Sequence, residues 1–474
     1  MDFQQLLECC GKGGVEIRID SRKVCKGDIF VAIPGENEDG ATYIPAAIAA
    51  GAAHIVCKPG LWPDAVYHDN PRQALWQLAQ ARYHTDTLPL KVLGITGTNG
   101  KTTCTYLLEQ LLTRLGHKTG VIGTVSYRWP GHNEPAPLTT PDALQVHGML
   151  AQMAAAGCDY AVMEVSSHAL AQERVGGVPF AGAAFTNLTQ DHLDFHQDMQ
   201  KYFACKSRLF QDFPLKNKKM AINADDSWGQ RLLDGFPTAL GYGLSRPATP
   251  SGRYLWGELL HAGTDGCHMR MHLDGRTWEL HSRLVGAFNA ANLLTVQALA
   301  LELGFAPEDF AQLESFAGVC GRLERVINDK GLHVFVDYAH TPDALVNVLK
   351  ALRAAGFKRI VAVFGCGGNR DRSKRPLMGQ AVAQYADVAV LTSDNPRFEE
   401  PLAIMDDVRP GLAGAAQVIC EVDRREATAR ALALLGPDDA LLVAGKGHED
   451  YQIINGVKHH YSDQEVVREI LACA

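Results

Sequence analysis

The stretch Leu90-Lys-Val-Leu-Gly-Ile-Thr-Gly-Thr-Asn-Gly-Lys-Thr-Thr103 predicts a phosphate-binding loop. It opens with apolar residues typical of a strand, turns through glycine, threonine and asparagine, and continues into a helix-like segment at 101–115. Gly-Lys-Thr between a strand and a helix is the context in which this motif binds nucleotide phosphates. The strict motif has another glycine five residues before Gly100, where this chain has Ile95, so the loop is a variant.

Each residue type of the loop suits a phosphate group. Gly97 and Gly100 let the backbone curl so that successive N–H groups point at one anion, and the helix N-terminus adds partial positive charge. Lys101 can reach the terminal phosphates, and the Thr102 hydroxyl suits Mg²⁺. The residues predicted to bind the nucleotide here are Gly97, Thr98, Asn99, Gly100, Lys101, Thr102 and Thr103. The alternative is a glycine-rich turn before an ordinary helix.

Length and composition indicate a globular chain of about three domains. It has 474 residues, of which 46% are hydrophobic and 21% charged, and a net charge of −8 without a basic block. We therefore expect no nucleic-acid partner, and the short apolar runs predict no membrane insertion. Twelve scattered cysteines without an export signal favour reduced thiols in a cytoplasmic protein, which we expect to be a monomer.

The predicted first domain, at 1–88, is a small α/β unit. Short strands are expected at 17–22, 28–33 and His54–Cys57, and a helix at 43–53. Its Asp20-Ser-Arg22 segment offers a carboxylate, a hydroxyl and a guanidinium in one turn. A solvated turn with an internal ion pair is an equally good interpretation of that segment.

The predicted second domain, at 89–319, alternates strands and helices around the phosphate loop. Apolar strands at 119–123, 160–165 and 181–186 indicate a parallel sheet covered on both faces. Ligands of such sheets lie at the carboxyl ends of the strands. The less regular residues at 245–280 suggest a small antiparallel insert.

Two side chains near these strand ends are candidate metal ligands. Glu164 ends one strand, and His192 follows the next. A carboxylate and a neutral imidazole can bind a hard divalent cation, although imidazole is less usual for Mg²⁺. Alternatively, Glu164 caps a strand end and His192 orders its loop.

The segment Tyr202-Phe-Ala-Cys-Lys-Ser-Arg-Leu-Phe210 predicts an amphipathic helix. Phe203, Leu209 and Phe210 are available for burial, and Lys206 lies on a different part of the helix from Phe203 and Phe210. From this spacing alone, Lys206 is expected to be a surface lysine.

The predicted third domain, at 320–474, is a second doubly wound unit. Strands are expected at 334–337, Arg359–Phe364, Val388–Leu391, Val418–Cys420 and 441–444. The overall prediction is an α/β protein of three domains, with a central P-loop parallel-sheet ATPase domain and a C-terminal Rossmann-like domain.

Three polar loops follow strands of the third domain. Gly365-Cys-Gly-Gly-Asn-Arg-Asp-Arg-Ser-Lys-Arg375 is rich in glycine and basic, which favours an anion site over a solvated basic loop. Asp394-Asn-Pro-Arg397 is either an ordinary turn or a reader of carboxylate and amine groups. Gly445-Lys-Gly-His-Glu-Asp450 allows close approach of a ligand.

These loops together suit a zwitterionic substrate. Arg370 and Arg397 can bind its carboxylate, and Glu449 can pair with its ammonium. A catalytic base role for His448 has no support from spacing.

An ordered set of motifs resembles the Mur ligases of peptidoglycan synthesis over essentially the whole chain. The set comprises Gly-Thr-Asn-Gly-Lys-Thr-Thr103, Glu-Val-Ser-Ser-His168, Asn187 through His192, Asn289-Ala-Ala-Asn292, Gly321-Arg322 and Asp337-Tyr-Ala-His-Thr-Pro342. Within the family, the Asp-Asn-Pro-Arg and Gly-Lys-Gly-His-Glu-Asp loops are similar to those of members that add meso-diaminopimelate to UDP-N-acetylmuramoyl-L-alanyl-D-glutamate.

The resemblance implies a role for each domain. The first would bind the UDP part through Ser21, the second ATP and Mg²⁺, and the third the incoming amino acid. Residues implied to hold the muramoyl peptide are Thr139, Thr140, Ser166, Gln172 and Arg174. Residues implied to hold adenine, phosphate and ribose are Asn292, Arg322 and Asp337. Those implied to hold the amino acid are Arg370, Asp394, Asn395, Pro396, Arg397, Gly445 and Glu449.

The resemblance also reverses the interpretation of Lys206. Ala204-Cys-Lys-Ser-Arg-Leu-Phe210 matches the pattern in which the family's lysine is carbamylated. An ammonium cannot ligate Mg²⁺, whereas a carbamate supplies anionic oxygens. The implied metal ligands are thus Thr102, Glu164, His192 and Lys206. Two stretches depart from the family pattern: Leu138 stands where an asparagine is familiar, and Glu36-Asn-Glu38 falls in a variable uridine-side loop.

The implied reaction is ATP-dependent amide formation through an acyl phosphate, with Lys101, Lys206, Glu164 and His192 as its catalytic residues. Two alternatives stay within the ligase class: a ligase that adds L-lysine and a folylpolyglutamate synthase. A third is a P-loop regulatory NTPase that binds a partner without ligating anything. A coupled assay for ADP and phosphate separates these functions.

Overall fold

The computed structural model describes residues 1–35, 38–213, 219–246, 252–263 and 265–473, and the chain divides into two compact units. The first unit comprises Met1–Thr96, Leu112–Ala184 and Ala204–Met220, and the second Gly97–Leu111, Phe185–Phe203 and Ala221–Ala474. Both units combine helices with parallel strands, which confirms the predicted α/β class. Within the described ranges, no helix is long and apolar enough to cross a lipid bilayer.

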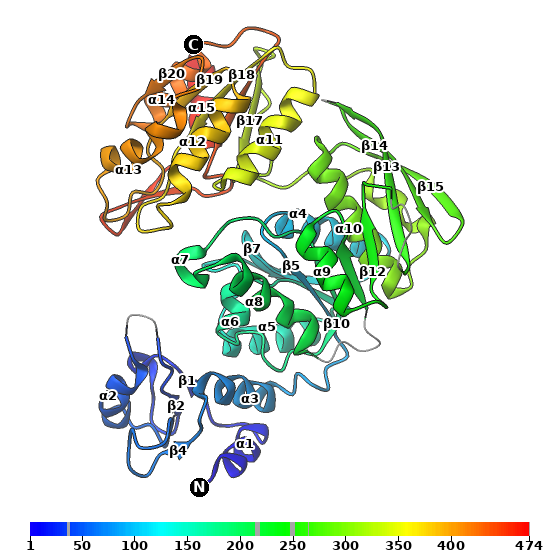
Figure 1. Cartoon of the computed structure of the whole chain (residues 1–474). Coiled ribbons are helices and arrows are strands. Elements are labelled where there is room, and N and C mark those ends of the chain that lie inside the picture. Colours follow the sequence, from blue (N-terminus) through cyan, green and yellow to red (C-terminus); the bar gives the residue numbers. More distant parts are fainter. Residues whose placement is uncertain (36–37, 214–218, 247–251, 264, 474) are drawn as a thin grey trace. The chain divides into compact units, whose positions relative to one another are not determined.

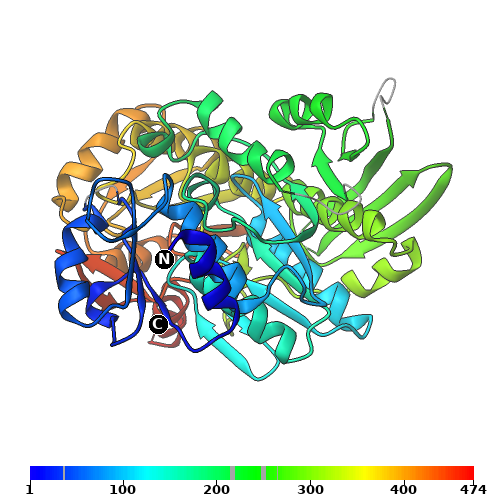
Figure 2. The same cartoon turned by 90° about the horizontal axis from the view of Figure 1, so that it is seen from below.

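A small parallel sheet begins the first unit (Figure 1, Figure 2). Its strands in spatial order are β1 (Ile17–Arg18), β2 (Ile29–Val31), β3 (His54–Cys57) and β4 (Val66–Tyr67), and its helices are α1 (Phe3–Gly11), α2 (Ile44–Ala49) and α3 (Pro71–Tyr83). Side chains alternate between the faces of β2: Ile29 and Val31 join the core with Leu6 of α1, whereas Phe30 packs with Ile44 of α2.

The strand predicted at 17–22 is shorter in the structure. It ends at Arg18, and a 3₁₀ helix, η1 (Ser21–Lys23), follows. The Asp20 carboxylate accepts from the Arg22 backbone N–H at 3.1 Å and from the Arg22 guanidinium at 2.9 Å. These local bonds compete with strand pairing and close the turn.

The first unit also carries the strands on either side of the phosphate loop. Their spatial order is β10 (Phe180–Phe185), β5 (Lys91–Thr96), β9 (Tyr160–Glu164), β6 (Thr119–Ile122), β7 (Ser126–Trp129) and β8 (His132–Pro135). Strands β5, β9 and β6 are parallel as predicted, whereas β7 and β8 add an antiparallel edge. Its helices here are α5 (Ala143–Ala155) and α6 (Ser167–Ala171), whereas α4 (Lys101–Arg114) and α8 (Met199–Gln211) each have residues in both units.

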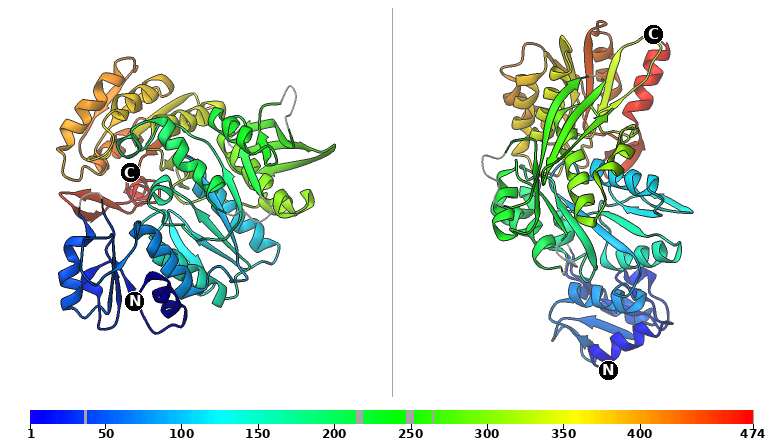
Figure 3. Two further views of the ribbon diagram at one scale, coloured as in Figure 1. Left: turned by 60° about the horizontal axis from the view of Figure 1, so that its bottom comes forward. Right: turned by 90° about the vertical axis from the view of Figure 1, so that its right-hand side faces the viewer.

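The second unit contains five further strands (Figure 3). In spatial order they are β15 (Arg276–Ser282), β14 (Gly266–Leu273), β13 (Tyr254–Gly263), β12 (Leu240–Gly243) and β11 (Met220–Asn223), and β11, β12 and β13 pair parallel. Strands β13 to β15 pair antiparallel, which confirms the insert predicted at 245–280. Its helices are α7 (Leu193–His196), α9 (Ser227–Gly235) and α10 (Ala287–Leu303), and a 3₁₀ helix, η4 (Pro307–Leu313), follows.

A doubly wound sheet completes the second unit. Its strands in spatial order are β16 (Glu324–Arg325), β17 (His333–Asp337), β21 (Asp439–Ala444), β18 (Arg359–Phe364), β19 (Val388–Leu391) and β20 (Val418–Cys420). A two-stranded ribbon of β22 (Tyr451–Ile454) and β23 (Val457–His460) stands apart. The helices that pack on the six-stranded sheet are α11 (Pro342–Ala354), α12 (Lys374–Tyr385), α13 (Pro401–Val408), α14 (Arg424–Leu432) and α15 (Asp463–Cys473).

Alternate residues sort this sheet into two cores. Ile360 and Ala362 of β18 join the core with α11, α12 and α13, whereas Val361 and Val363 join the core with α14 and α15 (Figure 1). Because both faces are covered, β18 and β19 are apolar along almost their whole length, and this is why the sequence predicted these two strands so closely.

Candidate functional site

The phosphate loop requires glycine at two positions. Gly97 and Gly100 have φ values of 149° and 87°, in the left-handed region that favours glycine. A Cβ atom at Gly97 would lie 1.9 Å from Thr186 Oγ1, and one at Gly100 would lie 2.3 Å from Asn292 Oδ1. Both glycines therefore let neighbouring polar side chains approach the loop backbone.

Asn99 is fixed at the tip of the loop. Its backbone N–H donates to Asn187 Oδ1 at 2.9 Å, and its carbonyl accepts from Thr186 Oγ1 at 2.6 Å. Its side-chain amide donates to Asp343 Oδ2 at 2.8 Å. The predicted motif beginning at Asn187 thus holds the loop in shape.

Lys101 directly follows the loop, and its side chain folds back over it. Its ammonium donates to the carbonyls of Gly97 and Thr98 at 2.9 and 2.8 Å. The unusual Ile95 is explained by its position, because it is buried within β5 and the loop begins only at Gly97. A glycine at position 95 would therefore not take part in the turn of the loop.

Arg322 reaches the start of helix α4. Its guanidinium donates to the buried Thr102 hydroxyl at 3.0 Å and lies 4.6 Å from the centre of the Tyr338 ring. Cation–π packing of this kind holds a guanidinium in place. Arg322 and Thr102, predicted separately as phosphate and Mg²⁺ residues, are therefore in contact.

Asp337 ends strand β17 and is buried. Its two carboxylate oxygens accept from the backbone N–H groups of Leu323 and Ala339 at 2.6 and 2.7 Å. Burial raises the pKa of this carboxyl, and the nearby Arg322 charge opposes that rise. Asp337 therefore fixes the backbone at Leu323, directly after Gly321-Arg322, and at Ala339.

Asn292 lies on helix α10 beside the loop. Its amide donates to Asn289 Oδ1 at 3.1 Å, and its Oδ1 accepts from the Cys104 thiol at 3.5 Å. These contacts explain the spacing of the Asn-Ala-Ala-Asn motif, which puts both amides on one face of the helix.

In the first unit, Glu164 is held by a threonine. Its two carboxylate oxygens accept from the Thr124 backbone N–H and hydroxyl, both at 2.9 Å. Thr139 Oγ1 lies 3.1 Å from the same Thr124 hydroxyl, and the Thr140 hydroxyl donates to the Glu164 backbone carbonyl at 2.8 Å. The structure thus brings three predicted residues together: Glu164, Thr139 and Thr140.

The remaining predicted muramoyl-peptide residues join this network. Ser166 caps helix α6, and its backbone N–H donates to Thr140 Oγ1 at 3.1 Å. Arg174 donates to the Thr140 carbonyl at 2.8 Å and to Gln172 Oε1 at 2.7 Å. These bonds place the Arg174 guanidinium beside Thr140 and Gln172.

Lys206 is buried, with only 1% of its surface exposed. The surface position expected from spacing alone is therefore wrong. The buried residues of α8 include Tyr202, Cys205 and Leu209, which follow a helical repeat that also contains Lys206. The spacing argument failed because it took the half-buried Phe203 as part of the buried stripe.

His192 lies in a polar cluster that the sequence revealed only in part. Its Nε2 is 3.3 Å from Asp191 Oδ2, and Lys374 Nζ is 3.6 Å from Asp191 Oδ1. Burial opposes ionisation of Asp191, but His192 and Lys374 outweigh it and hold its pKa well below the usual range. Burial lowers the pKa of the neighbouring His340, and Lys374 adds to that effect.

The basic loop before α12 is only partly free for an anion. Arg375 is buried and pairs with Glu399 and Asp407 at 2.9 and 2.8 Å. Arg372 also pairs with Asp407, at 2.9 Å. Arg370, the residue predicted to bind a carboxylate, is exposed.

Arg397 is held in an unusual backbone conformation. Its φ of 55° lies in the left-handed region, its N–H donates to the Ile453 carbonyl at 3.0 Å, and its carbonyl accepts from Asn455 N–H at 2.6 Å. Its guanidinium donates to the Gly368 carbonyl at 2.8 Å. Desolvation and the nearby Arg370 charge lower the Arg397 pKa, because both disfavour its charged form.

The other polar residues of this loop form one network. Asn395 donates to Glu449 Oε2 at 2.9 Å and accepts from Lys446 Nζ at 3.1 Å. Burial and the nearby Asp394 raise the pKa of Glu449. Burial opposes ionisation of Asp394, but Lys446 and Arg424 outweigh it and lower its pKa. The buried Lys446 was not predicted, because a lysine between two glycines carries no sign of burial.

A fully buried ion pair supports this network from behind. Arg424 and Asp463 meet at 2.8 Å with no exposed side-chain surface, and Arg424 also donates to the Ala444 carbonyl at 2.9 Å. A Cβ atom at Gly445 would lie 2.5 Å from Asp394 Oδ2, so glycine is required there. Arg424 and Asp463 lie far apart in sequence, and no local motif predicted their contact.

The predicted residues are divided between the units. Thr102, His192 and the amino-acid loops belong to the second unit, whereas Glu164, Lys206 and the muramoyl-peptide residues belong to the first. Ser21 lies in η1, beside the Asp20–Arg22 ion pair. Leu138 is half exposed, and Glu36 and Asn37 lie outside the described residues.

Three family models match successive parts of the chain: the Mur ligase family catalytic domain at 15–83, the Mur ligase middle domain at 95–300 and the Mur ligase glutamate ligase domain at 321–447. A UDP-N-acetylmuramoyl-L-alanyl-D-glutamate--2,6-diaminopimelate ligase of Lawsonia intracellularis is 55% identical, covering 96% of each chain. One with the same name from Thermosynechococcus vestitus is 44% identical, covering 96% of this chain and 92% of its own.

A solved structure of a ligase with that name is 33% identical to this chain. It superposes with a TM-score of 0.67, covering 97% of this chain and 94% of its own. The chain therefore belongs to the Mur ligase family.

Proposed function

We propose that this chain joins meso-diaminopimelate to UDP-N-acetylmuramoyl-L-alanyl-D-glutamate, with conversion of ATP to ADP and phosphate. It is an ATP-dependent amide ligase of peptidoglycan synthesis that acts on small molecules, and its relatives at 44 and 55% identity carry this activity in their names. The observation that carries the proposal is the pair of polar loops in which Asn395 donates to Glu449 and Arg397 donates to the Gly368 carbonyl. It offers a guanidinium and a carboxylate to an amino acid, on the same unit as the phosphate loop.

The nucleotide contacts are proposed on the phosphate loop. The positive φ values of Gly97 and Gly100 support a loop whose successive N–H groups point at one phosphate. Lys101, whose ammonium is held by loop carbonyls, needs only side-chain rotation to reach a phosphate. The proposed contacts of the loop are Gly97, Thr98, Asn99, Gly100, Lys101, Thr102 and Thr103, and those of the adenosine and phosphates are Asn292, Arg322 and Asp337.

The donor set fits Mg²⁺ in chemical type. Thr102 supplies a hydroxyl and Glu164 a carboxylate, which are the oxygen donors that Mg²⁺ prefers, while His192 is the less usual nitrogen donor. We propose that Lys206 completes the set as a carbamate, in which Nζ bonds to CO₂ and releases a proton. When bound, Mg²⁺ would neutralise charge on the transferring phosphoryl group.

The muramoyl peptide is proposed to contact the network around Thr140. Arg174 offers a guanidinium beside Thr140, and Ser166, Gln172 and Thr139 offer hydrogen-bonding groups. Ser21 is the proposed contact of the UDP part. The proposed division of labour follows the domains 1–88, 89–319 and 320–474, for UDP, ATP and amino acid respectively.

The proposed chemistry has two steps. The D-glutamate γ-carboxylate attacks the ATP γ-phosphorus, which gives an acyl phosphate and ADP, and Lys101 neutralises the developing charge. The amine of diaminopimelate then attacks the acyl carbon, loses a proton and expels phosphate. Holding both substrates in line supplies much of the rate.

The amino-acid site is proposed around Arg397. The Arg397 and Arg370 guanidinium groups suit a carboxylate of diaminopimelate, and Glu449 with Asp394 suits its ammonium. Asn395, Pro396 and Gly445 shape the loops that present these groups. L-lysine has no second carboxylate, so it would leave a guanidinium without its partner.

A coupled assay for ADP and phosphate tests the proposal. We expect turnover only when ATP, UDP-N-acetylmuramoyl-L-alanyl-D-glutamate and meso-diaminopimelate are all present. Omission of the dipeptide substrate should reduce ADP formation to background. Steady ADP formation from ATP alone would instead favour a regulatory NTPase.

A further inference from the structure

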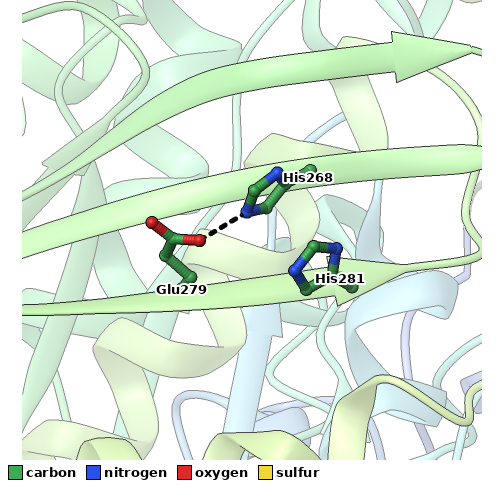
Figure 4. Close-up of side chains that lie close together, drawn as sticks. All are labelled: His268, Glu279 and His281. Atoms are coloured by element: carbon green, nitrogen blue, oxygen red, sulfur yellow. Dashed lines mark hydrogen bonds and ion pairs between the residues drawn. The ribbon is translucent and has the colours of Figure 1, made fainter.

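The exposed face of the antiparallel insert carries two histidines and a glutamate in close contact (Figure 4). His268 of β14 lies directly opposite His281 of β15, and Glu279 precedes His281 by two residues on the same strand. Because side chains two residues apart share a face of a strand, the register of this hairpin places all three groups together. None of the three belongs to the proposed ligase site.

The potential ligand atoms are already near one another. One atom from each of the three side chains lies within 4.8 Å of the other two. His268 Nε2 is 2.7 Å from Glu279 Oε2, and the rings of His268 and His281 stack with centres 3.9 Å apart and planes at 18°. Figure 4 shows the Glu279 carboxylate and a nitrogen of His281 turned toward His268.

Arg270 orients the glutamate of this cluster. Its guanidinium nitrogens lie 3.0 and 2.9 Å from Glu279 Oε1, on the oxygen that does not face His268. The other oxygen, Oε2, is thus directed at the imidazoles. Second partners of this kind fix the orientation of a metal-ligating carboxylate, and their loss typically weakens metal binding.

We propose that His268, Glu279 and His281 bind a divalent transition-metal ion of the Zn²⁺ class. Two imidazoles and a carboxylate match the ligands that Zn²⁺, Ni²⁺ and Cu²⁺ accept, whereas Mg²⁺ and Ca²⁺ prefer oxygen donors alone. Water would complete the coordination. The ion would bridge β14 and β15, and so would stabilise the hairpin that carries it.

Binding requires only a local adjustment. The stacked rings are nearly parallel, so both must tilt toward a shared ion at the usual Zn–N distance of about 2.0–2.1 Å. Glu279 and His281 are exposed and His268 is partly exposed, so their side chains can rotate without disturbing the core. The buried side chains of β14, among them Met269 and Met271, lie on the opposite face.

Calorimetric titration of the full chain with ZnCl₂, in excess MgCl₂, tests the site. The matched control is His272→Gln, because His272 lies on the same face of β14 but stacks on Trp256 instead, 4.4 Å away. We expect one Zn²⁺ to bind wild type and His272→Gln alike. His281→Ala and Glu279→Gln should weaken that binding more than about tenfold, since loss of an outer partner alone costs about 10–100-fold.

Zinc affinity that is the same in all four proteins would overturn the proposal, as would the absence of stoichiometric binding to wild type. Thermal unfolding of each variant without zinc checks that the hairpin has folded. A second readout is the NMR spectrum of the histidine rings. In wild type, Zn²⁺ should shift the ring signals of two histidines, and His268→Ala and His281→Ala should each alter that response. Neither measurement uses ligase activity, so failure here leaves the proposed ligase function untouched.

Discussion

At the scale of single residues, Arg397 is the side chain on which amino-acid choice is expected to depend. Truncating one partner of a buried charged contact costs several kcal/mol, and about 4 kcal/mol is roughly a thousandfold. We predict that Arg397→Ala lowers kcat/KM for meso-diaminopimelate by about that factor, with a much smaller effect on the KM for ATP. Arg397→Lys should recover little, because an ammonium lacks the two-pronged geometry.

The control for Arg397 is Arg409→Ala. Arg409 is exposed and pairs with Asp406 three residues away, so its loss should leave kcat/KM within about twofold, as for most surface ion pairs. The measurement is kcat/KM for diaminopimelate and for L-lysine in each protein. An unchanged ratio of the two constants in Arg397→Ala would show that this loop does not read the distal carboxylate.

Lys206 carries the second prediction at this scale. A buried lysine is expected either to pair or to lose its charge, and a carbamate would make it an anionic ligand. We predict a mass addition matching CO₂ on Lys206, near loss of activity in Lys206→Ala, and partial rescue by formate. Lys201→Ala, on the exposed side of the same helix, should retain activity. Full activity of Lys206→Ala would contradict a catalytic role.

Side chains show where sequence reasoning reaches its limit. Glu164 was predicted from its place at a strand end, and Thr139, Thr140 and Arg174 from the family resemblance. The structure joins all four through hydrogen bonds. Lys446 is buried behind Asn395 with no signal in its neighbours, since its burial depends on strands distant in sequence.

At the scale of elements, the phosphate loop depends on glycine for two separable reasons. Gly100 and Gly116 flank the two ends of α4, and both have φ near +90°. An added Cβ atom would meet a neighbouring side chain, that of Asn292, only at Gly100. We predict that Gly116→Ala loses about 1 kcal/mol of unfolding free energy from backbone strain alone, and that Gly100→Ala loses more because Asn292 must also move. Only Gly100→Ala should also lose activity, by about a hundredfold, the usual effect of a small misplacement at a reacting site.

Denaturant unfolding and turnover of the two alanine variants check this prediction. Gly116 has open space around its position and serves as the matched control for backbone strain. Equal turnover in the two variants would mean that the close approach of Asn292 has no part in nucleotide binding.

His147 links helix α5 to the segments after α3 and α6. Its ring is buried, with Nδ1 2.5 Å from Thr85 Oγ1 and Nε2 2.9 Å from the Gly176 carbonyl. Burial lowers the pKa of His147 from 6.5 to about 4. Between about pH 6.5 and 4, His147 is therefore protonated in the unfolded chain but neutral in the folded chain. The free energy of unfolding falls as the pH falls through this range.

The expected loss of unfolding free energy from this one group, between about pH 6.5 and 4, is about 3 kcal/mol. His147→Gln should remove that part of the pH dependence, whereas the exposed His459→Gln should keep it. Denaturant unfolding at several pH values is the measurement. The same slope in wild type and His147→Gln would contradict the effect attributed to burial.

The elements themselves were largely predictable where strands are buried on both faces. Arg359–Phe364 and Val388–Leu391 are such strands and were predicted with the bounds that the structure has. The bounds of Val418–Cys420, a more exposed strand, were also predicted. The exception at 17–22 is instructive, because Asp20 bonds to Arg22 locally and turns an expected strand into η1. Local side-chain bonds of this kind are invisible to apolar periodicity.

At the scale of the whole molecule, the function follows from several groups acting on two large substrates. The same unit that carries the phosphate loop presents Arg397 and Glu449, while Glu164 and Arg174 belong to the other unit. Since the proposed contacts of the substrates are divided between the units, we predict that reaction requires ATP, the muramoyl dipeptide and the amino acid together.

The most direct measurement is the mass of the product formed in competition. The purified protein is given ATP, Mg²⁺, UDP-N-acetylmuramoyl-L-alanyl-D-glutamate, and equal concentrations of meso-diaminopimelate and L-lysine. We predict one tripeptide product, carrying diaminopimelate, in amounts equal to the ADP formed. A lysine product in comparable amount, or ADP formed without any tripeptide, would contradict the proposed function.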